Sequence, residues 1–232
     1  MKLLLLAALF PLAHPALATV IRFDGDGTPD GSKYGASWST VVFSGTNWSS
    51  NGSELSITTA PSRGIWFGWA NYVGDTPAWS ISDNLTGNHV SIRARLGASS
   101  GEWETYITDT SGYHTSINFN DAGSVSWFWN DATGLQSVTI AIDTTEYHTY
   151  ELLMKQGLVT FIVDDLVRGQ AFNTASGGIP ILLYGDGSGS TPTGFGSMFV
   201  EYAMIDTAPI PEPSSAFLVG LVSLSILRRK RH

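Results

Sequence analysis

The sequence of 232 residues contains no cysteine. It can therefore form no disulfide and use no thiol nucleophile or cysteine-bound metal, and its stability must come from the burial of apolar side chains. A long helical stripe, with apolar residues recurring about every 3.6 positions, is also missing, which disfavours an α-helical protein. Because no repeat of fixed period is present, a propeller or a solenoid is disfavoured as well.

Basic residues are scarce: the chain has 12 Lys and Arg against 20 Asp and Glu, for a net charge of −8. Five of the basic and one of the acidic residues lie in the two end segments described below, which leaves 7 basic against 19 acidic residues between Thr19 and Ala208. A surface of this sign repels nucleic-acid phosphates and acidic polysaccharides. We therefore expect no nucleic-acid partner.

The first 18 residues have the three parts of a secretory signal peptide. Lys2 supplies the positive charge, Leu3–Leu12 the apolar stretch, and Ala16 and Ala18 the small-x-small cleavage signal. This order predicts export by the Sec machinery and removal of the segment by signal peptidase. The mature chain would then begin near Thr19.

An apolar segment without formal charge, Ala216–Leu227, lies near the other end of the chain. It is shorter than the roughly 20 residues that span a bilayer comfortably. Basic residues that flank an apolar segment resist translocation, so the four that follow should stay on the cytoplasmic side. They are Arg228, Arg229, Lys230 and Arg231. We expect a single apolar helix that tethers an exported domain to the membrane in transit.

The motif Pro211-Glu212-Pro213 precedes this apolar segment. Taken together, the motif, the apolar stretch and the basic terminus in residues 209–232 resemble the PEP-CTERM sorting signal of Gram-negative bacteria that produce exopolysaccharide. The resemblance implies processing by exosortase, a membrane protease, and transfer from the inner membrane to the cell surface or extracellular matrix. A plain tail anchor with a proline stop before it is the alternative.

Residues 19–208 are expected to form one all-β domain. Short apolar or aromatic runs alternate there with clusters of Gly, Asn, Asp and Ser, a pattern typical of strands joined by turns. Two tight turns, at Gln156-Gly157 and Asp164-Asp165, predict consecutive hairpins, because Gly and Asp tolerate the positive φ that such turns require. The clearest expected strands are Ile92–Leu96, Trp103–Thr108, Thr115–Asn120, Val125–Trp129, Ser137–Ile142, His148–Lys155, Leu158–Val163 and Ser197–Ile205, with others near Val20–Phe23, Leu55–Thr58 and Ile65–Ala70.

The stretch Asp143–Gly169 is similar to the recurrent hairpin of concanavalin A-like lectin and glucanase jelly rolls, including laminin G-like domains. Leu182–Ser190 and Ser197–Asp206 resemble the closing elements of that family. The resemblance implies a two-sheet antiparallel β-sandwich of the jelly-roll type, with its sheets about 10 Å apart. Another β-sandwich is the alternative.

Glycoside hydrolysis, the obvious enzymatic activity for such a fold, needs two carboxylates about 5 to 9 Å apart. Glu102 and Glu104 alternate on one expected strand, so both should point to the same face at a compatible spacing of about 6.8 Å. The Glu-x-Asp-x-x-Glu strand motif of one large glucanase family of this fold is nevertheless absent, because Thr105, Tyr106 and Ile107 follow. Solvated strand glutamates are the simpler interpretation, and no catalytic residue is assigned outside the enzymatic alternative.

The segment "DGDGTPDG" concentrates Asp24, Asp26 and Asp30, with glycines that let the backbone fold around a hard cation. Calcium is the cofactor that these residues suggest. The segment is not an EF-hand loop, because Pro29 stands at the sixth position, where glycine is required. An acidic turn without a metal is the alternative, and no other cofactor is expected.

Tryptophan is unusually frequent, with eight in the chain. A flat aromatic face can stack on the C–H face of a sugar ring, although core filling explains most tryptophans equally well. In "SVSWFWN", the side chains of Val125, Trp127 and Trp129 share one face of the expected strand, and the valine suggests that this face points inward.

Alternation along the strands leaves a second set of side chains on the faces opposite the apolar ones. Their mixture of arginine, carboxylate, amide and aromatic groups suits a polar ligand such as an oligosaccharide, although a merely solvated sheet face could look the same. Two tryptophans of the segment Ser62–Trp79 could add an aromatic rim. The predicted ligand-binding residues are Arg93, Arg95, Glu104, Tyr106, Asn118, Phe128, Trp66 and Trp69.

The sequence therefore predicts an exported, exosortase-processed protein of the cell surface or extracellular matrix whose β-sandwich binds extracellular polysaccharide without catalysis. One alternative is a glycoside hydrolase or lyase of the same fold that uses Glu102 and Glu104. A structural matrix protein without a specific ligand is the other.

Overall fold

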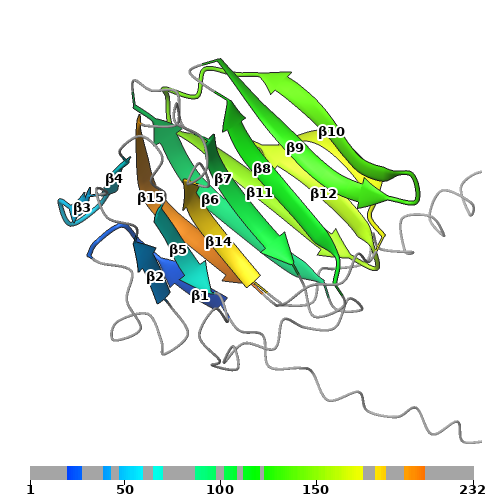
Figure 1. The fold of residues 1–232 in the computed structure, drawn as a ribbon, viewed down its shortest axis with the longest axis horizontal. Coiled ribbons are helices and arrows are strands. Elements are labelled where there is room, and N and C mark those ends of the chain that lie inside the picture. Colours follow the sequence, from blue (N-terminus) through cyan, green and yellow to red (C-terminus); the bar gives the residue numbers. More distant parts are fainter. Residues whose placement is uncertain are drawn as a thin grey trace, which may run out of the picture.

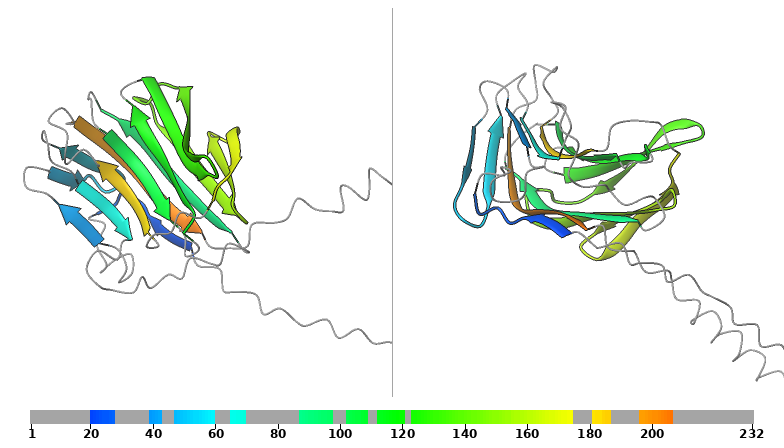
Figure 2. Two further views of the ribbon diagram at one scale, coloured as in Figure 1. Left: turned by 45° about the vertical axis from the view of Figure 1, so that its right-hand side comes forward. Right: turned by 90° about the horizontal axis from the view of Figure 1, so that it is seen from below.

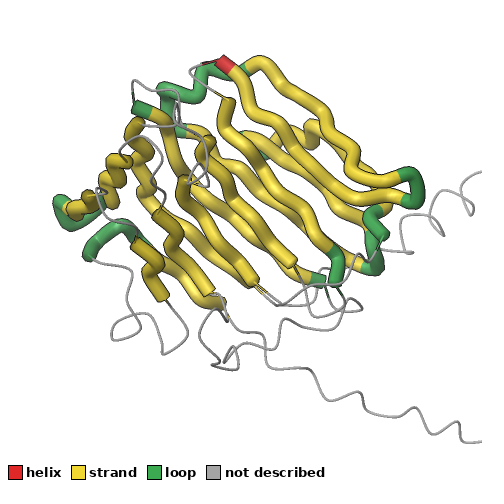
Figure 3. The backbone as a smooth tube through the Cα atoms, in the orientation of Figure 1, coloured by secondary structure: helices red, strands yellow, loops and turns green. Residues whose placement is uncertain are grey.

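The computed structural model describes residues 20–27, 39–42, 47–59, 65–69, 87–97, 102–108, 112–120, 123–174, 181–186 and 196–206. Strands make up most of these ranges (Figure 3). In chain order they are β1 (Val20–Phe23), β2 (Ser39–Val42), β3 (Asn47–Ser50), β4 (Leu55–Thr59), β5 (Ile65–Trp69), β6 (Asn88–Leu96), β7 (Glu102–Thr108), β8 (His114–Asn120), β9 (Ser124–Asp131), β10 (Gly134–Ala141), β11 (His148–Lys155), β12 (Leu158–Val163), β13 (Leu166–Phe172), β14 (Ile181–Asp186) and β15 (Gly196–Asp206).

The strands form two antiparallel sheets, here called sheet I and sheet II (Figure 1). Sheet I has the order β13-β12-β11-β6-β15-β4-β3, and β1 pairs with β15 as well. Sheet II has the order β10-β9-β8-β7-β14-β5-β2. The right-hand view of Figure 2 shows the two sheets as stacked layers. The predicted two-sheet antiparallel β-sandwich is therefore confirmed.

The core lies between the sheets and takes alternate side chains from the central strands of both, as the pleat of a strand dictates. Phe119 of sheet II and Tyr150 of sheet I meet across the core, edge to face, with 4.8 Å between their ring centroids. The largest fully buried side chains are Trp103, Trp127, Tyr150, Tyr184, Phe23, Phe119, Phe161, Leu55 and Ile57. Full burial of an apolar side chain contributes about 1.5–3 kcal/mol, which lets a chain without disulfides hold this fold.

The inward orientation expected for the tryptophans of β9 is confirmed. Trp127 is 1% exposed and stacks on Trp129 with 4.3 Å between the ring centroids. The indole N–H of Trp127 donates a hydrogen bond of 2.8 Å to the hydroxyl of Thr115, so this buried polar group has a partner.

Both predicted tight turns are also confirmed. The φ angles are 52° at Gln156 and 78° at Gly157, and 50° at Asp164 and 62° at Asp165. Two consecutive residues with positive φ match the right-handed twist of the flanking strands, so the turns fix the β11–β12–β13 meander at the end of sheet I.

Several sequence predictions fall outside the described ranges, including the signal peptide and the sorting segment 209–232. Within the described ranges, no helix combines the length and the apolar character needed to cross a membrane. Of the tryptophan-rich segment Ser62–Trp79, the structure describes only Ile65–Trp69, which forms the expected strand.

Candidate functional site

A row of polar residues crosses the outer face of sheet II, on the side away from the core. Glu104 of β7 is paired with Asn118 of β8, which is paired with Ser126 of β9, which is paired with Thr139 of β10. We call these four residues the polar row. Directly opposite residues on neighbouring strands lie about 4.5–5.5 Å apart, so their side chains can contact one another in sequence across the sheet.

Hydrogen bonds hold the side chains of the polar row in fixed orientations. The Asn118 amide donates to Glu104 Oε1 at 2.9 Å, and the hydroxyls of Ser126 and Thr139 lie 2.7 Å apart. Asn120 donates to the Ser126 hydroxyl at 2.6 Å. A set of donors and acceptors fixed in this way loses little side-chain entropy when it binds a polar ligand.

Three of the four residues of the polar row are sheltered from solvent, and only Thr139 is exposed. Ser126 is only 5% exposed, its neighbour Ser116 is 7% exposed, and Glu104 and Asn118 are half-buried. Polar groups sheltered from water form stronger hydrogen bonds than fully solvated ones. The row therefore has the partial shelter of a binding face.

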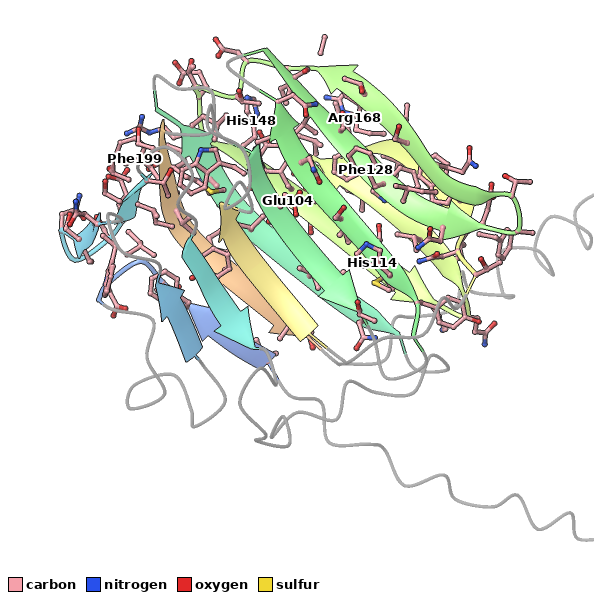
Figure 4. The ribbon with its side chains drawn as sticks, viewed as in Figure 1. Glu104, His114, Phe128, His148, Arg168 and Phe199 are labelled. Atoms are coloured by element: carbon pink, nitrogen blue, oxygen red, sulfur yellow. The ribbon has the colours of Figure 1, made fainter. Side chains whose placement is uncertain are left out.

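An aromatic side chain lies beside the polar row. Phe128 of β9 is half-buried and in register with Ser116 of β8, two residues along the strand from Ser126, so the two β9 side chains share a face. Figure 4 shows Phe128 and Glu104 on the same sheet. A ring next to a row of hydrogen-bonding groups is the combination that recognises a sugar, which has an apolar C–H face and a rim of hydroxyls.

The strands of sheet II contain no lysine and no arginine. They carry four carboxylates, on Glu102, Glu104, Asp131 and Asp186. Burial lowers the pKa of His114 on β8, against an opposing effect of a backbone hydrogen bond involving Ile107, so this imidazole is uncharged at neutral pH. The described part of sheet II thus offers an anionic ligand no fixed positive charge.

Four other predicted site residues lie on strands of sheet II, two on β5 and two on β7. Gly185 of β14 pairs with Glu104 on one side and with Trp66 of β5 on the other, so Trp66 stands two strands from the polar row. Glu102 and Tyr106 flank Glu104 on β7, and their side chains lie outside what the structure describes. The backbone of the fourth, Trp69, pairs with Leu182.

Arg93 and Arg95 lie on β6 of sheet I, so the sandwich core separates them from the polar row. They face away from the core, as expected, but both have acidic partners. Arg93 donates to Glu201 at 2.7 Å, and Arg95 is 3.7 Å from Glu54. Their charges are therefore compensated within the protein itself.

Two aromatic rings contact Arg95 and form a cluster with it and its acidic partner Glu54. The guanidinium of Arg95 stacks on Phe199, 3.9 Å from the ring centroid, and lies 5.1 Å from that of Tyr147. The hydroxyl of Tyr147 donates a hydrogen bond to Glu54. Burial, together with this hydrogen bond, raises the pKa of Tyr147 to about 12. The cluster is self-contained, which suits a structural role.

The proposed metal-binding segment is described only in part. Asp24 forms an ion pair with Arg22, and Asp30 lies outside the described ranges. Among the described residues there is no group of three or more His, Asp or Glu side chains that could hold a metal ion.

Thr139 belongs to the polar row but was not among the predicted ligand-binding residues. Its strand was predicted, yet a single exposed threonine has no distinguishing signal in the sequence. Only the register of β9 with β10 places it next to Ser126.

Comparisons with known proteins bear on the fold alone. No protein-family model matches the chain, and no curated protein matches it in sequence. Among solved structures, Crh5 transglycosylase in complex with NAG is similar with a TM-score of 0.55 and 17% identity, over 83% of this chain and 84% of that one.

Two further structures share the architecture. A protein of unknown function from Shewanella oneidensis MR-1 is similar with a TM-score of 0.53 and 12% identity, over 84% of this chain and 90% of that one. The receptor-binding domain of botulinum neurotoxin D is similar with a TM-score of 0.52 and 9% identity, over 83% of this chain and 49% of that one. At such low identity the likeness shows the β-sandwich fold and no particular activity.

Proposed function

We propose that this protein is a carbohydrate-binding β-sandwich that acts outside the cell without catalysing a reaction. The polar row is the observation that carries the proposal. It presents a carboxylate, an amide and two hydroxyls in one line, held by hydrogen bonds and sheltered except at Thr139, with Phe128 beside them.

The expected ligand is an uncharged polysaccharide. Neutral sugars offer hydroxyl groups that can donate to Glu104 and exchange hydrogen bonds with Asn118, and an apolar ring face that can stack on Phe128. A polyuronate or a sulfated glycan would meet the carboxylates of sheet II without a lysine or arginine on its strands to compensate them, and would be repelled.

We further propose that the protein reaches the cell surface or extracellular matrix of a Gram-negative bacterium, where such polysaccharides occur. The signal peptide, the Pro211-Glu212-Pro213 motif and the basic terminus support this route through exosortase. A binding domain released in this way would be positioned to hold exopolysaccharide at the surface.

Binding can be measured by isothermal titration of the purified full-length chain with laminarin, a neutral β-glucan, with N-acetylglucosamine oligosaccharides, and with alginate, a polyuronate. We expect affinity for at least one neutral glycan and none for alginate. Asn118→Ala and Phe128→Ala should each weaken that binding about tenfold, since a hydrogen bond to a charged group or an aromatic contact contributes on the order of 1.4 kcal/mol.

Arg168→Ala, on the exposed edge of sheet I, is the matched control and should leave the affinity unchanged. If neither Asn118→Ala nor Phe128→Ala changes the affinity, the glycan-binding site lies elsewhere on the protein. Release of reducing ends that disappears in Glu104→Gln would instead indicate a glycoside hydrolase, and no binding to any glycan would favour the structural role.

A further inference from the structure

Among the described strands, four of the five open sheet edges are protected against pairing with another chain. The edge strands β1, β2 and β3 have only four residues each. The edge strand β13 has an irregular register against β12, with a shift between Phe161 and Ile162, and it carries the charged Arg168. Short length, irregularity and charge are the usual means by which proteins prevent strand addition at an open edge.

The remaining edge, β10 of sheet II, has none of these protections. It is eight residues long and pairs with β9 without a register shift from Gly134 to Ala141. Its sequence, GLQSVTIA, contains no charged residue and no proline. Figure 1 shows β10 as the outermost strand of its sheet, with no described strand beyond it.

The free backbone groups of β10 can be identified from one hydrogen bond. The amide of Ile142, just after the strand, donates to the Gly123 carbonyl at 3.2 Å, so the backbone of residue 142 points toward the β9 side. In an antiparallel ladder this direction alternates from residue to residue. Four residues therefore point their N–H and C=O groups outward: Leu135, Ser137, Thr139 and Ala141.

Two apolar side chains of β10 are exposed to solvent, and a partner strand would partly cover them. Leu135 is 63% exposed and Val138 is 37% exposed. The chain has a net charge of −8, so two copies repel each other over much of their surface. An uncharged edge of eight residues is a place where two copies can meet without like charges opposed. Its four outward residues are spaced symmetrically about Val138, so they can pair with the same four residues of a second copy, which is the partner that fits.

We propose that β10 pairs antiparallel with β10 of a second copy, about a twofold axis at Val138. In this register Leu135 lies opposite Ala141 of the other copy, and Ser137 lies opposite Thr139, so all the outward backbone groups find partners. Val138 meets its own equivalent in a non-hydrogen-bonded pair, with Cα atoms about 4.5 Å apart. The two copies of sheet II then form one continuous sheet, with their two polar rows on the same face.

Cysteine crosslinking tests the register directly, because the native chain has no cysteine. In Val138→Cys, the two thiols would face each other at a Cα separation within the range that disulfides accept, about 4.4–6.8 Å. Under mild oxidation of the full-length chain we expect a disulfide-linked dimer in high yield. The matched control is Val167→Cys, on the exposed edge strand β13, which should remain largely monomeric.

A second variant tests the pairing without a crosslink. Ser137→Pro removes an outward amide and leaves the β9–β10 hydrogen bonds in place, and proline is tolerated where an edge N–H faces solvent. Light scattering over a range of concentrations should show a dimer for the unmodified chain and a monomer for this variant. A monomer for the unmodified chain at all concentrations, or equal crosslinking of the two cysteine variants, would overturn the proposal whatever the outcome of the glycan titrations.

Discussion

Three aspartates close to turns have a lowered pKa. Hydrogen bonds from the hydroxyl and amide of Thr133 lower the pKa of Asp131, and those from Thr145 do the same for Asp143. These two carboxylates organise their own turns as ionised acceptors. Each such group stabilises the folded state only while it is ionised.

Asp164 connects two elements of sheet I. Partial burial would raise its pKa, but the amide of Thr149 at 2.9 Å and the imidazole of His148 at 2.5 Å outweigh burial and lower it. His148 also contacts the carbonyl of Asp143 at 3.0 Å. The β12–β13 turn and the segment before β11 are thereby joined through one carboxylate.

The pH dependence of stability should reflect this carboxylate. Because the pKa of Asp164 is lower in the folded than in the unfolded chain, its contribution is complete above the ordinary value of 3.8 and is lost as the pH falls below it. Asp164→Asn should therefore flatten the loss of stability between about pH 5 and pH 2. Urea unfolding at a series of pH values measures this effect.

Asp165→Asn, in the same turn, is the matched control and should keep the acid sensitivity of the unmodified chain. An Asp164→Asn protein with an unchanged pH profile would show that the contacts with His148 and Thr149 contribute nothing to acid stability.

At the scale of elements, β13 depends on a close approach between the two sheets. A Cβ atom at Gly169 would lie 2.8 Å from Cζ3 of the Trp127 indole. That ring has little freedom to move, because it is hydrogen-bonded to Thr115 and packed between Trp129 and Phe161. A side chain at this position of β13 would therefore strain the core.

Gly169→Ala should destabilise the fold by about 1–3 kcal/mol, the range found when extra atoms are forced into a packed core. Thermal or urea unfolding would measure the loss. Gly123→Ala is the control, since a Cβ there meets no atom within 4 Å, and it should change stability little. Equal stability of the two variants would mean that β13 can shift away from Trp127 without cost.

The meander β11–β12–β13 could be predicted because its determinants are local. Alternation along each strand and positive-φ residues at each turn lie within a few residues of one another. The short strands β2 and β3 were missed, since their few residues carry no clear pattern and they form only against β5 and β4.

At the scale of the whole molecule, the two ends of the chain are proposed to direct the sandwich to the outside of the cell. Deletion of residues 216–232 should shift the protein from the membrane fraction to a soluble exported fraction in a Gram-negative host, because the apolar tether is lost. Cell fractionation followed by N-terminal sequencing would measure both location and processing, and we expect mature chains to begin near Thr19.

A protein that stays with the membrane after this deletion would place its anchor elsewhere. Replacing Lys230 alone is a suitable control, because three arginines remain to resist translocation. Chains that retain Met1 would contradict export through the signal peptide.

The sequence by itself determined the fold class, the inward and outward faces of the central strands, and the two tight turns, because all of these depend on neighbours along the chain. It also placed Glu104, Asn118 and Phe128 on solvent-side faces. The tertiary structure alone decided that these three lie together on sheet II, that Arg93 and Arg95 lie on the other sheet, and that Thr139 extends the polar row. Apart from the hairpins joined by tight turns, strand order and register are set by packing between segments distant in sequence, which no local pattern encodes.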